Sequence, residues 1–133
     1  MMQDKRKVLI VDDDEGTREF VEAIMANEGW ATVEGRNGRE AIELAEQEQP
    51  DLIILDVMMP EMDGFEAFQQ LRSQFLTKDI PVVMLTALND LQPGPDHNEE
   101  TMEQQLGVNR PEGFVDKPVD AVFLLNTILG VVG

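Results

Sequence analysis

The stretch that decides the fold is Leu52 to Gly64, which reads LIILDVMMPEMDG. It opens with an uninterrupted apolar run, places Asp56 directly after that run, and continues into a proline and a glycine, which break regular structure. A short apolar run bounded in this way is typical of a strand buried on both faces of a parallel sheet. The stretch therefore predicts a central strand over residues 52–55 with an aspartate at its carboxyl end.

Four further apolar runs extend this pattern along the chain. Val8–Val11 and Val82–Leu85 are runs of the same kind, while Ala31–Val33 and Phe114–Val115 are shorter and are predicted as edge or near-edge strands. Amphipathic stretches separate them, with inward positions predicted at Phe20, Val21, Ile24 and Met25; at Ala41, Ile42 and Ala45; at Phe65, Phe68, Leu71 and Phe75; and over residues 121–129. This alternation predicts an α/β fold, a doubly wound parallel sheet of five strands with right-handed crossovers.

Length and composition bound the class of protein. The 133 residues suit a single domain over 1–133, with 1–6 as a flexible N-terminal extension. A formal net charge of −17 argues against direct binding of nucleic acid, because so acidic a surface repels phosphates. The chain has no cysteine, which excludes disulfides and thiolate metal sites. It shows neither a signal-peptide segment nor an apolar run long enough to span a membrane, so we expect a cytoplasmic protein.

Three aspartates follow the ends of two predicted strands. Asp12 and Asp13 come directly after the first apolar run, and Asp56 comes directly after the central one. Ligands of open parallel sheets bind at the carboxyl ends of the strands, so these carboxylates are expected in one crevice. Two like charges about 4 Å apart cost roughly 4 kcal/mol at an effective dielectric near 20, which a bound cation would relieve.

Oxygen ligands alone favour a hard divalent ion such as Mg²⁺. The simpler interpretation is that strand-end aspartates cap the helices that follow them, and it stays open for Asp12 and Asp14. Thr86 and Lys117 end two more predicted strands, and each alone is explained as a packing residue or a surface lysine. Together with the three carboxylates, however, a hydroxyl and an ammonium group could donate to the oxygens of a phosphoryl group held there.

Four blocks of the sequence together resemble the receiver domains of two-component response regulators. They are VLIVDDD at 8–14, DVMMPEMDG at 56–64, PVVMLTA at 81–87 and Lys117-Pro118. The likeness extends over nearly the whole chain. It implies the flavodoxin-like strand order 2-1-3-4-5, and a phosphorylation-activated signalling switch that turns over no external substrate.

The resemblance also implies how phosphorylation would occur. Asp56 would accept a phosphoryl group from a sensor histidine kinase, a phosphotransfer protein or a small phosphodonor. Mg²⁺ would be bound directly by Asp13 and Asp56 and by the backbone carbonyl of Met58, while Asp12 would act through water. Lys117 would form a salt bridge with the phosphoryl group, and the peptide bond before Pro118 would be cis.

A switch is implied in the same way. Thr86 would hydrogen-bond the phosphoryl group, and the movement of its loop would let Phe114 turn inward, which is a shift between two populated arrangements. The surface of the fourth helix, fifth strand and fifth helix would then bind an unknown downstream protein. An ordinary structural role for Phe114 within its strand remains open.

The sequence departs from the receiver pattern between Thr86 and Lys117, whose spacing is longer than is typical of the family. The extra length falls in residues 89–111, where Pro93-Gly94-Pro95 would break a helix. We therefore expect an irregular, extended fourth-helix region, with a short helix at most over 99–106. His97, the only histidine, lies there without neighbouring ligand candidates and is expected to be a surface residue.

Two further departures from the receiver pattern bear on the lifetime of the phosphorylated state and on binding partners. Met58 and Leu88 lie where receivers line the approach to the phosphoryl group, and because both are apolar they predict slow self-dephosphorylation. The last helix carries more apolar residues than one sheet face can cover, which predicts an interface, with a homodimer as one form of it. These residues are Val119, Val122, Leu125, Ile128, Leu129, Val131 and Val132.

Three other functions fit the sequence less well. A phosphatase of the haloacid dehalogenase type needs a carboxylate two residues after its nucleophile, where this chain has Met58. A flavodoxin-like cofactor binder would bring its phosphate against the acidic Asp12–Asp13 turn. An interaction domain that works without phosphorylation is disfavoured because all five site residues are present, although presence does not prove use.

Overall fold

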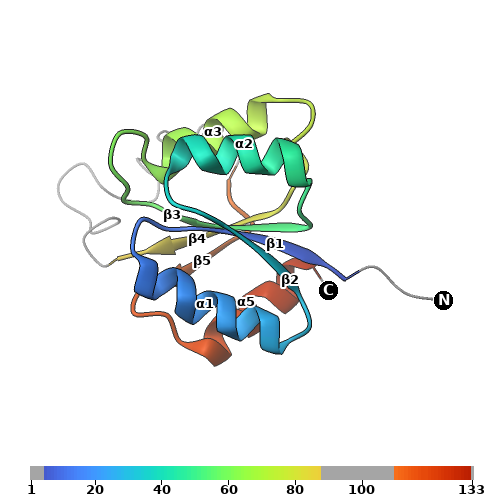
Figure 1. The fold of residues 1–133 in the computed structure, drawn as a ribbon, viewed down its shortest axis with the longest axis vertical. Coiled ribbons are helices and arrows are strands. Elements are labelled where there is room, and N and C mark those ends of the chain that lie inside the picture. The colour runs from blue at the N-terminus through green and yellow to red at the C-terminus, as the bar shows by residue number, and fades with distance from the viewer. Residues whose placement is uncertain (1–4, 88–109, 133) are drawn as a thin grey trace.

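A computed structural model describes residues 5–87 and 110–132 of the chain. Its strands form one parallel sheet in the order β2-β1-β3-β4-β5, which confirms the predicted doubly wound topology (Figure 1). In chain order the elements are β1 (Lys7–Val11), α1 (Glu15–Asn27), β2 (Ala31–Gly35), α2 (Gly38–Glu48), β3 (Leu52–Asp56), α3 (Gly64–Ser73), β4 (Val82–Thr86), β5 (Gly113–Asp116) and α5 (Ala121–Val132). The two weaker strand predictions are the two edges of the sheet, β2 and β5.

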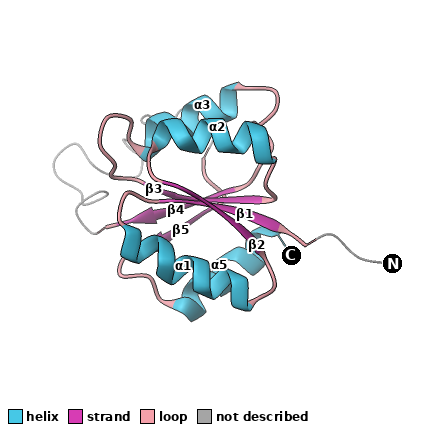
Figure 2. Cartoon of the chain, in the orientation of Figure 1, coloured by secondary structure: helices cyan, strands magenta, loops and turns pink. Residues whose placement is uncertain are grey.

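Helices cover both faces of the sheet, α2 and α3 on one and α1 and α5 on the other (Figures 1 and 2). Alternate residues of each central strand enter different cores: Leu9, Ile53 and Met84 pack toward α2 and α3. Their neighbours Ile10 and Ile54 pack toward α1 and α5. Because neither face is open to water, β1, β3 and β4 have no place for a polar residue until their carboxyl ends, which explains the uninterrupted apolar runs.

Short polar residues begin three of the helices. Asp14, Asn37 and Asp63 each accept a hydrogen bond from a backbone amide in the first turn of α1, α2 and α3. This capping satisfies amides that have no partner within the helix. Capping is therefore the role of Asp14. Asp12 directly follows β1 and Asp56 ends β3, and both of these side chains are buried. Gly29, with φ of 92°, follows the end of α1 in the left-handed region that favours glycine.

Two apolar side chains lie elsewhere than predicted. Phe75 is 83% exposed because α3 ends at Ser73, so the residue lies beyond the helical face on which its spacing was counted. Phe20 is 49% exposed, since the buried positions of α1 are Arg18, Val21 and Met25. The proline-rich break at 93–95, the possible helix over 99–106, His97 and Leu88 lie outside the described residues. Among the helices described, none has the length and apolar character to cross a membrane.

Candidate functional site

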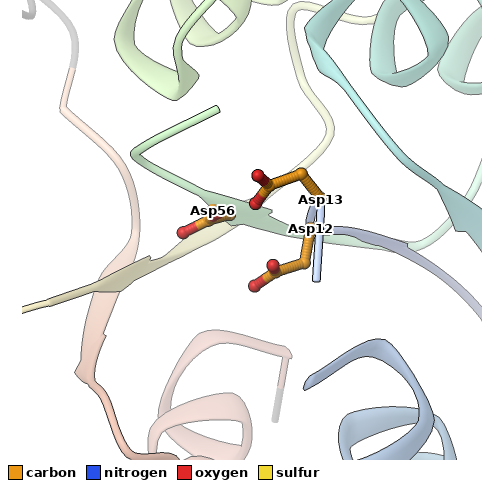
Figure 3. A group of neighbouring side chains, drawn as sticks. All are labelled: Asp12, Asp13 and Asp56. Carbon is orange, nitrogen blue, oxygen red and sulfur yellow. The ribbon is translucent and has the colours of Figure 1, made fainter. Parts of the chain in front are cut away.

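Three carboxylates meet at the carboxyl ends of β1 and β3. Asp12, Asp13 and Asp56 each offer an oxygen within 4.8 Å of the others, and Figure 3 shows the side chains together at this edge of the sheet. Asp12 is fully buried and Asp56 is 1% exposed, whereas Asp13 is exposed at the mouth of the site. The structure thus places together the three aspartates that the sequence predicted to converge.

Lys117 brings a positive charge to this cluster from the end of β5. Its Nζ donates a hydrogen bond to Asp56 Oδ1 at 2.8 Å and lies 3.1 Å from Asp12 Oδ2. Its backbone amide donates to the carbonyl oxygen of Thr86 at 2.7 Å, which ties the end of β5 to β4. The peptide bond between Lys117 and Pro118 is cis, as the sequence resemblance implied.

One ammonium group does not balance three carboxylates in so buried a place. Burial, with the neighbouring Asp12 charge, raises the pKa of Asp56 to about 7 against the hydrogen bond from Lys117. Burial likewise raises the pKa of Asp12. For Lys117, burial alone lowers the pKa, but the hydrogen bond to Asp56 and the charges of both aspartates outweigh it and raise the value.

Two buried oxygen atoms of this cluster lack a hydrogen-bond donor among the described residues. They are Asp56 Oδ2 and Asp12 Oδ2, the latter close to the Lys117 ammonium but outside hydrogen-bonding geometry. A buried acceptor without a partner is costly, and such groups are rare in folded proteins. Unpaired carboxylate oxygens beside an exposed third carboxylate are the donor set that a hard divalent cation requires, so the residues present fit Mg²⁺.

Backbone contacts hold this edge of the sheet in place. The buried Arg18 side chain donates from Nη1 to the carbonyl oxygen of Asp12 at 2.7 Å. On the other side, the Gly64 amide donates to the Val57 carbonyl at 2.7 Å. A Cβ atom at Gly64 would overlap the carbonyl oxygen of Asp56 and lie 2.8 Å from Val57 Cα, so only glycine lets the chain pass so close to this strand end.

The remaining predicted site residues surround this cluster. Thr86 ends β4, is 1% exposed, and donates from Oγ1 to Asp116 Oδ1 at 3.2 Å. Met58, two residues after Asp56, is 61% exposed. Phe114 is half-buried in β5 and packs against the core beneath α2 and α3. Phe114 therefore has a structural contact in this conformation, and its switch role stays a prediction.

Sequence reasoning missed three residues that shape the site: Arg18, Gly64 and Asp116. Arg18 was detectable as a lone cation on the predicted inward face of the first helix. Gly64 belonged to a block that was recognised as a whole, without a reason for the glycine itself. Asp116 carried no signal, because its contact with Thr86 depends on the parallel register that sets the two residues opposite each other.

Comparison with known proteins places this geometry in a family. The sequence model described as the response regulator receiver domain matches residues 8–129. The alkaline phosphatase synthesis transcriptional regulatory protein PhoP of Bacillus subtilis is 41% identical over 85 residues, which are 64% of this chain and 35% of that protein. The chain spans about a third of the length of the curated relatives it matches.

Solved structures agree with the sequence match. The chemotaxis protein CheY4 of Vibrio cholerae is 31% identical with a TM-score of 0.78, covering 95% of this chain and 98% of that one. The receiver domain of the sensor histidine kinase PA1611 of Pseudomonas aeruginosa, crystallised with magnesium in its active-site cleft, has a TM-score of 0.81 at 24% identity and covers 98% of this chain and 99% of that one. The chain described here belongs to the receiver-domain family of two-component response regulators.

Proposed function

We propose that this receiver domain is switched by phosphorylation of Asp56. The observation that carries the proposal is the state of that side chain, which is buried, hydrogen-bonded on one oxygen by Lys117 and, within the described part of the chain, without a donor on the other. The carboxylate would attack the phosphorus of a phosphohistidine or of a small acyl phosphate. A carboxylate–phosphorus bond forms, the bond from phosphorus to the donor breaks, and the donor leaves with its electron pair.

The described side chains suit the charge that develops in this transfer. Lys117 can stay close to the cluster and compensate negative charge on a phosphoryl oxygen, since its ammonium is already held at Asp56. Thr86 has its hydroxyl at the end of the neighbouring strand, from which it would donate to another phosphoryl oxygen. Asp13 and Met58 are both exposed, so water and a phosphodonor can reach the chain on either side of the buried Asp56 in this proposal.

Mg²⁺ fits the same cluster as the cofactor. Asp13 and Asp56 would bind the ion directly, together with the backbone carbonyl of Met58, and Asp12 would contact it through water. When bound, the ion supplies neutralising charge for the carboxylates and for the incoming phosphoryl group. The unpaired oxygens of Asp12 and Asp56 support this assignment because, among residues 5–87 and 110–132, Lys117 is the one cation paired with these two carboxylates.

The partners follow from the same chemistry. A sensor histidine kinase or a phosphotransfer protein would supply the phosphoryl group, and an unknown downstream protein would bind the surface of β5, α5 and the fourth-helix region. A second copy is a further proposed partner, because α5 has no charged residue and leaves Val122, Phe123 and Leu129 exposed. The chain would act in the cytoplasm, without direct contact to nucleic acid or membrane.

Intact mass measurement tests the proposal directly. The protein is incubated with acetyl phosphate and Mg²⁺, and the mass is expected to rise by one phosphoryl group. Asp56→Asn should show no such increase, whereas Asp51→Asn should react like the wild type. Asp51 is the matched control because it adjoins the same strand but is exposed and bonded to the Lys7 amide at the opposite edge of the sheet. Equal labelling of Asp56→Asn and wild type would disprove the assignment.

A further inference from the structure

The Thr86 hydroxyl already has a partner in this structure, the carboxylate of Asp116. Thr86 in β4 and Asp116 in β5 are opposite each other in the parallel register, and Thr86 Oγ1 lies 3.2 Å from Asp116 Oδ1. Lys117, the next residue, points its ammonium into the aspartate cluster. A carboxylate therefore accepts the same proton that the proposed function assigns to a phosphoryl oxygen.

The two bonds exclude each other. A threonine hydroxyl has a single proton to donate, and an ionised carboxylate can only accept. At 3.2 Å the bond to Asp116 is longer than most hydrogen bonds to a carboxylate, so Asp116 is a competitor that a phosphoryl oxygen can displace. Donation to a phosphoryl group on Asp56 requires that the bond from Thr86 to Asp116 is given up.

We propose that Asp116 acts as a competing acceptor that holds Thr86 in the resting arrangement and so sets how readily the switch responds. The inference rests on the proposed function of Asp56 and extends it. Asp116 is in this account a positioning residue, since it acts through Thr86 and touches neither the phosphoacceptor nor the phosphoryl group. Phosphorylation then has to draw the hydroxyl of Thr86 away from one carboxylate toward another anion.

The unequal burial of the pair favours such an exchange. Thr86 is 1% exposed, so its hydroxyl has few partners other than those within the site. Asp116 is exposed, so its carboxylate can be hydrated as soon as the hydroxyl leaves it. The backbone need not open, because the Lys117 amide is bonded to the Thr86 carbonyl at 2.7 Å independently of both side chains.

Charge acts in the same direction. A phosphoryl group adds a second anion beside Thr86, and like charges in this partly buried place repel each other. The repulsion displaces Asp116 toward solvent at the moment when the phosphoryl oxygens attract the hydroxyl. Removal of the Asp116 carboxylate should therefore make the phosphorylated arrangement easier to reach, which raises the apparent affinity for a phosphoryl analogue.

The experiment titrates beryllofluoride, a non-covalent phosphoryl analogue, into the 133-residue chain with Mg²⁺ and follows the Thr86 methyl signal by NMR. Asp116→Ala is expected to bind the analogue about three- to tenfold more tightly than wild type, the size of one lost hydrogen bond of ordinary strength. Asp116→Asn keeps an acceptor oxygen but no charge, so it should stay closer to wild type. In a Thr86→Val background, followed through the side-chain methyl signals at position 86, Asp116→Ala should tighten binding clearly less, because only the loss of charge repulsion remains.

A second measurement needs neither metal nor analogue. In the metal-free protein, three-bond couplings of the Thr86 methyl group should report one fixed χ1 rotamer in the wild type and averaging in Asp116→Ala. A purely structural role for Asp116 would lower the melting temperature of the variant and leave the rotamer and the affinity ratio unchanged.

The outcomes separate the two proposals. Wild-type protein that neither binds beryllofluoride nor gains a phosphoryl group overturns the function of Asp56 and the competing role of Asp116 together. Wild-type binding with no tightening in Asp116→Ala overturns the competing role alone. Equal tightening with and without the Thr86 hydroxyl also overturns it, since the effect would then come from charge and not from the hydrogen bond.

Discussion

The edge of the sheet where the parallel strands begin and the edge where they end both carry acidic and basic residues. The two edges differ in how completely the acidic groups are paired. At the edge where the strands begin, acidic groups are paired: Arg72 binds Glu112 at 2.6 Å, and Glu112 also accepts from the Val82 amide at 2.7 Å. Lys7 Nζ binds Glu48 at 2.9 Å. At the edge where the strands end, Asp12 and Asp56 keep oxygens that no described residue bonds, and the pKa values of both carboxyl groups are raised.

The contrast indicates that charged residues stabilise the fold at the first edge and that buried, incompletely paired carboxylates destabilise it at the second. The amino edge is arranged for holding the elements together, since Arg72 also donates to the Ile80 carbonyl at 2.7 Å and stacks 4.6 Å from the Phe68 ring centroid. At the carboxyl edge, two buried carboxylate oxygens have no hydrogen-bond donor among the described residues, which suits the proposed binding of a cation. Charges at the first edge should therefore matter for folding and charges at the second for function, and four measurements can test this division.

Arg72→Ala should have the largest effect. It removes a nearly buried guanidinium, leaves the Ile80 carbonyl without this donor and takes from Glu112 its counter-charge, which is expected to lower the free energy of unfolding by about 2–4 kcal/mol. Urea denaturation measures the loss. Asp56 phosphorylation in the folded variant should stay close to wild type, and a large drop in labelling with little change in stability would contradict the division between the edges.

Addition of Mg²⁺ should give the next largest effect. At about a hundredfold excess over its dissociation constant, the ion is expected to raise the free energy of unfolding by about 2.7 kcal/mol, because it binds the folded chain alone. The increase should be much smaller in Asp13→Asn and should persist in Glu112→Gln, measured in each case against EDTA. Equal stabilisation of wild type and Asp13→Asn would exclude Asp13 as a ligand.

Asp56→Asn should stabilise the metal-free protein. The folded pKa of Asp56, about 7, lies above its unfolded value of 3.8, so the folded state binds more protons between them. Stability from this group is present at low pH and is lost as pH rises toward 7. In EDTA the variant should therefore gain over wild type by about 2 kcal/mol between about pH 5 and about pH 8, as one pKa unit corresponds to roughly 1.4 kcal/mol. If the free energy of unfolding had the same pH dependence in both proteins, the raised pKa of Asp56 would be contradicted.

Met58→Asn should have the smallest effect. A polar amide at this exposed position could orient an attacking water, so phosphate release from Asp56 is expected to quicken about three- to tenfold. Loss of the phosphorylated mass over time measures the rate, and Met58→Leu is the matched apolar control. An Asn variant as slow as the Leu variant would show that the apolar residue only packs at the entrance.

Much of the fold could be predicted from the sequence, because short apolar runs alternating with amphipathic helices are buried on both faces in a parallel sheet that helices cover on both sides. The convergence of Asp12, Asp13 and Asp56 followed from the same topology, since parallel strands bring their carboxyl ends to one edge. Phe75 was placed wrongly because helical spacing does not say where a helix stops. The bond between Thr86 and Asp116 was out of reach, since it depends on the cross-strand register and on two rotamers.

Because Gly64 has no side chain, the start of α3 packs directly against the backbone of Asp56. The first turn of that helix packs against the carbonyl oxygen of Asp56, and no methyl group fits between them. A protein engineer who transplants or lengthens the loop after β3 must carry this glycine along. An alanine there would push β3 and α3 apart and so displace Asp56. The proposed phosphorylation of Asp56 would then be impaired, although the glycine takes no chemical part in it.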